Sequence, residues 1–190
     1  MDADYYGFCH YRRFFSFSKE NIPETCWGTI EYDYLDDKAI KELHFNEKDM
    51  KNYINNYDFL IAKGISINSL GASSVYEHYK NASELHIEDV DILLEIIKEK
   101  YPYLSETAEE YFQGKVFFPC NMFIMKKEVF NTYSAILFDL LDEFEKRADM
   151  SEYSGKGIVR QGIWERESQV FIIYTYRNKR NIVLENCRLH

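Results

Sequence analysis

The chain has 190 residues, of which 46% are hydrophobic and 17% aromatic, enough apolar material to bury the core of one globular domain. Its formal net charge of -9 and the absence of a long Lys or Arg stripe argue against a nucleic-acid-binding surface. No apolar run approaches the roughly 18 residues of a transmembrane segment. The four cysteines are widely spaced, which favours reduced thiols. We therefore expect a single cytoplasmic domain over residues 1–190, with peripheral attachment to the inner face of the cell membrane left open.

The first apolar run, Tyr5–Cys9, predicts a strand that leads directly into His10, Arg12 and Arg13. In open α/β sheets, ligands bind outside the carboxyl ends of such strands. Arginine pairs bind phosphate oxygens in a bidentate manner and stay charged at every working pH, so the cluster suits the pyrophosphate of a nucleotide sugar. A strand whose polar end simply meets water has the same pattern, and both interpretations stay open.

The next segment predicts a loop, two helices and a strand. Residues 16–34 predict a loop along the sheet edge. Residues 35–45 and 47–56 predict short helices whose charges form a solvated face. Asp58–Ala62 then predicts a compact buried strand, followed by Lys63 at a position that faces ligand in many α/β folds. A solvent-facing lysine is the commoner case at such a position.

A short helix is predicted to begin near Val75, with Ser73 or Ser74 as its N-cap. Tyr76 and His78 on this helix are candidates for the wall of an acceptor site. The same spacing of rings also makes a packing face, so the pattern alone does not separate binding from packing.

Three further helical segments predict the scaffold. Glu88–Lys100 has apolar side chains at amphipathic spacing, and Pro102 stops the helix. Leu104–Phe112 predicts a second helix, with Gly114 in the left-handed conformation beyond its end. Glu128–Arg147 carries the clearest apolar stripe and predicts a core helix.

Two polar residues in apolar surroundings are candidate site residues. Val116–Met125 predicts an extended buried segment that Pro119 and Cys120 interrupt. In this segment Asn121 either ties down a loop or holds a sugar hydroxyl, because a buried Asn must be hydrogen-bonded. Glu165 lies at the start of a predicted helix, whose dipole keeps a carboxylate ionised. A base that deprotonates an acceptor hydroxyl must be ionised in this way. An ordinary first-turn glutamate paired with an arginine has the same pattern. Residues 182–189 predict a short edge strand or a loose end.

Five runs in chain order carry a family resemblance, supported by a weaker match at Glu165-Arg166 and Val170–Ile172. They are Tyr6–Phe14, Tyr57–Ile61, Ser74–Tyr79, Ile97–Pro102 and Asn121–Lys127. Together they resemble the bacterial domain of unknown function 4422 family, which is associated with capsular and exopolysaccharide synthesis and regarded as glycosyltransferases. The resemblance implies an α/β fold, a partial nucleotide-diphosphosugar-transferase-like (GT-A type) mixed sheet with flanking helices. Family members carry a further segment before the first run, so we expect an N-terminally truncated domain with an exposed sheet edge and self-association through it.

The resemblance implies transfer of a sugar from a nucleotide-sugar donor to a saccharide or lipid-linked saccharide acceptor. His10, Arg12 and Arg13 would bind the donor, and Glu165 would act as the base. Asn121, Tyr76 and His78 would line the acceptor site.

We expect no metal site of the Asp-x-Asp type, because Asp2 and Asp4 have that spacing but precede the strand, and His10, Tyr11 and Arg12 follow it. Cationic side chains would then take the role of the metal. A catalytically inactive saccharide-binding or assembly module, left by loss of the nucleotide-binding segment, is the alternative function.

Overall fold

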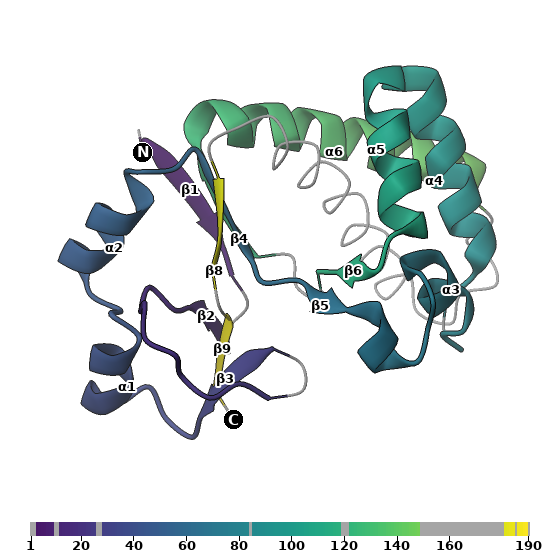
Figure 1. Cartoon of the computed structure of the whole chain (residues 1–190). Coiled ribbons are helices and arrows are strands. Elements are labelled where there is room, and N and C mark those ends of the chain that lie inside the picture. The colour runs from purple at the N-terminus through teal and green to yellow at the C-terminus, as the bar shows by residue number, and fades with distance from the viewer. Residues whose placement is uncertain are drawn as a thin grey trace. The chain divides into compact units, whose positions relative to one another are not determined.

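The structure is a computed structural model, and it divides into two compact units that we describe one at a time (Figure 1). It describes residues 3–9, 12–25, 28–83, 85–118 and 122–148, and the backbone of residues 181–184 and 186–189. The first unit comprises Met1–Ile65, Phe118–Phe130 and Asn178–His190, and the second comprises Ser66–Phe117 and Asn131–Arg177.

A mixed four-stranded sheet forms the centre of the first unit. Its strands, in the order β1-β7-β4-β8, are β1 (Tyr5–Phe8), β7 (Phe123–Lys126), β4 (Phe59–Ala62) and β8 (Asn181–Leu184). Strand β7 runs antiparallel to both β1 and β4, whereas β4 runs parallel to β8. Strand β1 pairs with β7 alone among the described strands, so it lies at an edge of this sheet. The arrangement confirms the predicted α/β class with a mixed sheet and flanking helices.

Both faces of β4 are buried, since all four of its side chains are shielded from solvent. Leu60 lies opposite Ile124 of β7 and packs with Phe15 and Phe17 on one face of the sheet. Helix α2 (Glu47–Ile54) covers this face with a row of apolar side chains. These are Met50, Tyr53 and Ile54. Burial on both faces explains why the run reads as continuously apolar in the sequence.

The other face of the sheet is packed by the first turn of α6 (Lys127–Arg147). The ring of Phe130 stacks on Tyr6 of β1 at a centroid distance of 4.8 Å and lies 6.2 Å from the ring of Phe123. Because successive side chains along a strand point to opposite faces, Tyr6 and Phe8 turn toward α6 while Tyr5 and Gly7 turn away from it.

A second sheet of three strands has the order β2-β9-β3. Strand β9 (Asn186–Leu189) runs antiparallel to β2 (Arg13–Phe15) and parallel to β3 (Thr29–Tyr32). The prediction of a loop throughout residues 16–34 is therefore wrong at β3. The C-terminal residues form two strands, β9 at the centre of this sheet and β8 at the edge of the four-stranded sheet. The physical reason is that the pairing partner comes from the other end of the chain, where no local pattern records it.

Two short helices follow β3 in the first unit, and a side chain caps each. Asp36 accepts a hydrogen bond from the Ala39 amide at the start of α1 (Asp37–Glu42), at 2.8 Å. Asn46 accepts one from the Asp49 amide at the start of α2, at 3.0 Å. These caps satisfy amides that have no partner within a helix, as the prediction of helices over 35–45 and 47–56 requires.

The second unit is mainly helical. Its elements include the 3-10 helix η1 (Ile67–Leu70), α3 (Val75–Lys80), α4 (Ile87–Lys100), α5 (Pro102–Gln113), the greater part of α6, and the paired strands β5 (Ile65–Ser66) and β6 (Val116–Phe117). Ser74 caps α3 as predicted, by accepting a hydrogen bond from the Glu77 amide at 3.1 Å. Pro102 ends α4 and becomes the first residue of α5.

One expectation at the end of this unit is wrong. Gly114 has φ -75° and ψ 171°, which is extended rather than left-handed, because the chain leaves α5 directly into β6. The two ends of the interrupted run predicted over 116–125 form β6 and β7, which belong to different sheets. Pro119 lies between them and lacks the amide donor that a continuous ladder needs.

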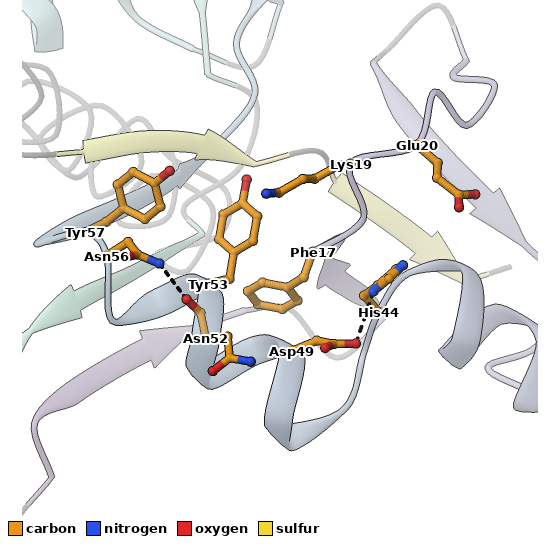
Figure 2. A pocket seen from close by; sticks show the side chains of 9 residues that line it. All are labelled: Phe17, Lys19, Glu20, His44, Asp49, Asn52, Tyr53, Asn56 and Tyr57. Atoms are coloured by element: carbon orange, nitrogen blue, oxygen red, sulfur yellow. Dashed lines mark hydrogen bonds and ion pairs between the residues drawn. The ribbon is translucent and has the colours of Figure 1, made fainter.

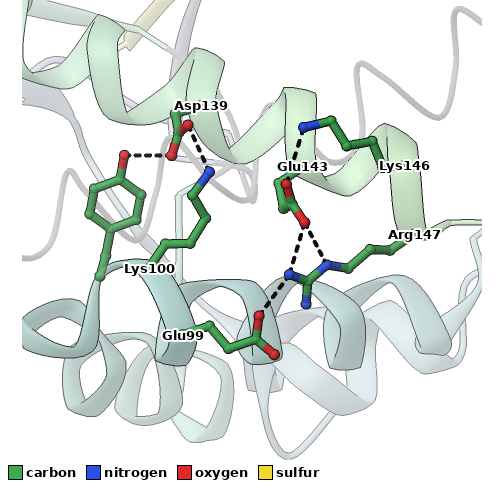
Figure 3. Close-up of polar contacts among 7 residues, drawn as sticks. Glu99, Lys100, Asp139, Glu143, Lys146 and Arg147 are labelled. Carbon is green, nitrogen blue, oxygen red and sulfur yellow. Dashed lines mark hydrogen bonds and ion pairs between the residues drawn. The ribbon is translucent and has the colours of Figure 1, made fainter.

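Ion pairs connect α6 to the end of α4 (Figure 3). Asp139 accepts hydrogen bonds from Lys100 Nζ at 2.7 Å and from the Tyr101 hydroxyl at 2.8 Å. Arg147 donates to Glu99 at 2.7 Å and to Glu143 at 2.9 Å. The hydrogen bond from Lys100 is the largest cause that holds the pKa of Asp139 below its ordinary value. Burial, together with the neighbouring Asp139, raises the pKa of Tyr101 to about 12.

Replacing Asp139 by Asn should flatten the acid dependence of stability. A carboxylate with a lowered pKa stabilises the fold above its unfolded-state pKa near 3.8, and this stabilisation is lost as the pH falls through the lower folded-state value. We expect the free energy of unfolding, from urea titrations between about pH 5 and pH 2.5, to fall less steeply in Asp139→Asn than in the wild type. Asp142→Asn, an exposed change on the same helix, should keep the wild-type slope. Identical slopes for all three proteins would contradict the assignment.

Candidate functional site

Arg12 and Arg13 lie at the connection from β1 to β2 in the first unit, where the sequence predicts an anion site. Arg12 is exposed, and Arg13 is the half-buried first residue of β2. The strand register places Arg13 opposite Arg188 of β9, and Arg188 in turn beside Glu31 of β3. Sequence reasoning missed the position of Arg188, because only the register of a non-local strand brings it beside Arg13.

The other predicted site residues are distributed differently. His10, Asn121 and Glu165 lie outside the described residues, so their proposed cluster with Arg12 and Arg13 stays a prediction. Lys63 forms an ion pair with Glu24 at 2.6 Å, which gives this strand-end lysine a partner inside the first unit.

Tyr76 and His78 lie on α3 in the second unit, and both contact other parts of that unit. The Tyr76 hydroxyl donates to Asp91 of α4 at 3.0 Å, and burial is the main cause that raises the pKa of Tyr76. The ring of His78 lies 5.5 Å from that of Phe117. These contacts are what a packing face provides, and the acceptor role stays a prediction.

A hollow of about 410 Å³ lies in the first unit beside α2; we call it the α2 hollow (Figure 2). It has an aromatic side and a polar side. The aromatic residues are Phe17, Tyr53 and Tyr57. The polar residues are Lys19, Glu20, His44, Asp49, Asn52 and Asn56. Its volume falls within the range of about 300–1,000 Å³ that is usual for sites of small molecules.

The helical repeat explains how α2 supplies most of this lining. Asp49, Asn52, Tyr53, Asn56 and Tyr57 follow one another at i, i+3, i+4, i+7 and i+8, which places them along one side of the helix and its final turn. The remaining lining residues come from the segment after β2 and from the connection between α1 and α2.

Asp49 is the electrostatic centre of this lining. Its Oδ2 accepts hydrogen bonds from Asn46 Nδ2 at 2.7 Å and from His44 Nδ1 at 3.1 Å. The hydrogen bond from Asn46 is the largest cause that holds the pKa of Asp49 below its ordinary value, so the carboxylate is ionised at neutral pH. His44 has φ 52°, a left-handed backbone that costs a side-chain-bearing residue about 1–2 kcal/mol.

A smaller, almost wholly apolar cavity of about 180 Å³ lies at the end of β1. Phe8 lines it from β1, Cys9 lines it just after β1, and Phe14 lines it from β2. Phe17 borders both this cavity and the α2 hollow. The aromatic residues after Arg13 therefore form the wall between the end of β1 and the hollow.

The chemistry available here is hydrogen bonding, ring stacking and anion binding. In the parts of the chain that the structure describes, no group of three or more His, Cys, Asp or Glu side chains is placed to hold a metal ion. The α2 hollow offers amides and carboxylates beside aromatic rings, and the β1–β2 connection offers guanidinium groups.

The sequence interpretation of residues 47–56 as a solvated helix missed the hollow. A signal was present: the pair Asn52-Tyr53 recurs four residues later as Asn56-Tyr57. A four-residue repeat stacks like side chains on one side of a helix, so it predicts a stripe that combines amides with rings. An interpretation based on the total charge of the segment overlooks this stripe.

Comparison with solved structures defines the class of fold. The chain matches the apo structure of WbbM, a bifunctional glycosyltransferase, with a TM-score of 0.92 and 29% sequence identity. The match covers 100% of this chain and 34% of that chain, so this chain spans about a third of the length of the protein it matches. Its mixed α/β fold is thus one that occurs within a glycosyltransferase.

The family model of the domain of unknown function DUF4422 matches residues 1–164. The chain belongs to this family, as its ordered motifs predicted. Comparison with curated proteins gives no match. None of the helices in the described ranges has the length and apolar character needed to cross a membrane.

Changing Asn46 to Ala should raise the pKa of Asp49, because it removes the hydrogen bond that contributes most to the lowered value. The pKa would be read from the ¹³C shift of the Asp49 carboxyl group in an NMR titration. Loss of the cap should also cost about 1 kcal/mol of stability, measured by urea unfolding. Asn52→Ala is the control, since Asn52 makes no hydrogen bond to Asp49, and it should leave this titration unchanged. A wild-type Asp49 titration in Asn46→Ala would refute the assignment.

Proposed function

We propose that this chain is a glycosyltransferase, or a part of one, that transfers a sugar from a nucleotide-sugar donor to a saccharide acceptor. The observation that carries the proposal is the match of its whole length to WbbM, at 29% identity and a TM-score of 0.92. Membership of the DUF4422 family supports the same activity. The proposed setting is capsular or exopolysaccharide synthesis at the inner face of the cell membrane, with a saccharide or a lipid-linked saccharide as acceptor.

Arg12 and Arg13, with His10, are the proposed binding groups for the donor diphosphate. The chain carries a formal charge of -9, so a diphosphate needs a local group of cations to overcome the average repulsion. Adjacent guanidinium groups provide it, because each one offers a planar fork that fits two phosphate oxygens. In this proposal the arginines neutralise the diphosphate, and no residue is assigned as a metal ligand.

The proposed reaction gives each of the predicted site residues a role. An acceptor hydroxyl oxygen forms a bond to the anomeric carbon of the donor sugar, and the bond from that carbon to the diphosphate oxygen breaks. If the transfer inverts the anomeric centre, Glu165 accepts the hydroxyl proton, and the guanidinium groups stabilise the negative charge on the departing diphosphate. Asn121, Tyr76 and His78 are the proposed contacts to the acceptor.

Two measurements on the chain test this function. Calorimetric titration with UDP, GDP and dTDP tests for a donor site, and release of nucleoside diphosphate from the matching sugar nucleotides, with neutral oligosaccharides present, tests for transfer. Binding of one nucleoside diphosphate, displaced by its sugar nucleotide, is the expected result. The donor assignment is overturned if none of the three binds at millimolar concentration.

Arg12→Ala should weaken the binding of the preferred nucleoside diphosphate by roughly 10- to 100-fold, because a hydrogen bond to a charged group contributes about 1.5–3 kcal/mol. Arg12→Lys should give an intermediate affinity, since it keeps the charge and loses the bidentate geometry. Lys98→Ala removes an exposed cation of α4 and is the control for net charge. Equal losses in Arg12→Ala and Lys98→Ala would argue that the arginine acts only through overall charge.

A further inference from the structure

The α2 hollow has the size and the walls of a small-molecule site, and neither the family match nor the structural match assigns it a ligand. Its lining comes from three parts of the first unit, which are α2 with its final turn, the segment after β2 and the connection between α1 and α2. Figure 2 shows the rings of Phe17 and Tyr53 and the ends of Lys19 and Asn56 around the same space. The question is which chemistry such a lining recognises.

The aromatic side is a set of rings in contact with one another. The Tyr53 ring lies 5.9 Å from that of Phe17, at an interplanar angle of 73°, and 5.8 Å from that of Tyr57, at 35°. Phe17 is only 4% exposed and belongs to the core beneath Leu60, so the rings are held in place before a ligand arrives. The electron-rich face of an aromatic ring attracts C–H groups, such as those along one face of a pyranose.

The polar side retains unused hydrogen-bonding capacity. Within the residues that the structure describes, the side chains of Lys19, Glu20 and Asn52 form no hydrogen bond or ion pair with protein groups. Asn56 donates through Nδ2 to the backbone carbonyl of Asn52 at 2.6 Å. A primary amide can both donate and accept, which matches a sugar hydroxyl that does the same.

The charge of the lining separates it from the proposed donor site. The lining contains two carboxylates, Glu20 and Asp49, and one ammonium group, Lys19, so the hollow is weakly negative where the β1–β2 connection is positive. The hydrogen bonds from Asn46 and His44 keep Asp49 ionised. A diphosphate would be repelled here, whereas an uncharged polyol is not.

We propose that the α2 hollow binds a neutral saccharide, through stacking on Tyr53 and Tyr57 and hydrogen bonds from Asn52 and Asn56. Its role as the subsite for the acceptor glycan rests on the proposed function of the chain. The binding itself rests on the contacts of the hollow. In this assignment the α2 hollow replaces Asn121 as the proposed saccharide contact of the first unit.

The probe is a panel of neutral disaccharides, namely lactose, maltose and cellobiose, followed by ¹H–¹⁵N NMR on the whole chain. At least one should shift the amide resonances of residues 49–57 with a millimolar dissociation constant. UDP should shift resonances near Arg12 and leave residues 49–57 unchanged. If no disaccharide shifts residues 49–57 at 50 mM, or if the shifts lie elsewhere, the proposal is wrong.

Asn52→Ala should weaken binding of the preferred disaccharide by about 2- to 10-fold, the effect of losing one hydrogen bond. The matched control is Asn55→Ala, since Asn55 is an exposed residue of the same type at the C-cap of α2 and does not line the hollow. It should bind as the wild type does. Equal affinity in the wild type and in Asn52→Ala would overturn the assignment of this amide, and equal weakening by both variants would point to a general effect on α2.

The same titrations distinguish this proposal from the donor assignment. Saccharide binding without binding of any nucleoside diphosphate would leave the hollow as a saccharide site and remove the donor site. Binding of a nucleoside diphosphate without saccharide-induced shifts on α2 would support the donor site and rule out the hollow as a saccharide site.

Discussion

The antiparallel pairing of β7 with β4 is the interaction on which the rest of the first unit depends. It joins residues 59–62 to residues 123–126 and leaves the second edge of β7 for β1. Leu60 is completely buried opposite Ile124, and burial of one such side chain contributes about 1.5–3 kcal/mol. Without this pairing, the β1–β7 pair would no longer be joined to β4 and β8, and the arginines that follow β1 would lose that support.

The same core determines the shape of the α2 hollow. Tyr53 packs against the Leu60 face of the sheet and also lines the hollow, so one side chain belongs to both. Asn52 is its neighbour in the sequence, and the helical repeat carries it to the solvent-facing border of the hollow. A wall built on a packed helix loses little conformational freedom on binding, which reduces the entropic cost of holding a weakly bound sugar. The packing of α2 on the sheet therefore both buries its apolar side chains and positions its proposed saccharide contacts.

Local patterns in the sequence predicted the elements that can be recognised without knowing which strand or helix they pair with. The apolar spacing in α4 and α6 and the apolar run of β4 were sufficient, because the residues of these elements themselves show the burial. The apolar run of β1 also predicted a strand, although its side chains are only half-buried or exposed. Strand β3 was missed because its ladder depends on β9, more than 150 residues away. The hollow was missed for a related reason: Phe17 and Tyr53 meet only after α2 docks on the sheet. Arg12 and Arg13 were proposed as site residues from their chemistry alone, whereas the position of Arg188 opposite Arg13 became known only from the strand register.

Charge gives the first unit two regions with different ligand chemistry. The guanidinium groups follow β1, whereas Glu20 and Asp49 lie around the hollow, and Phe17 with its aromatic neighbours stands between the hollow and the end of β1. Fields between exposed charges decay within about 8 Å at physiological ionic strength, so each region presents mainly its own sign to a ligand. A donor carries two or more negative charges on its diphosphate, and a growing neutral glycan carries none. A transferase that must hold both at once therefore gains discrimination from a cationic region for one and an aromatic, weakly anionic region for the other, because neither ligand then competes effectively for the other's site.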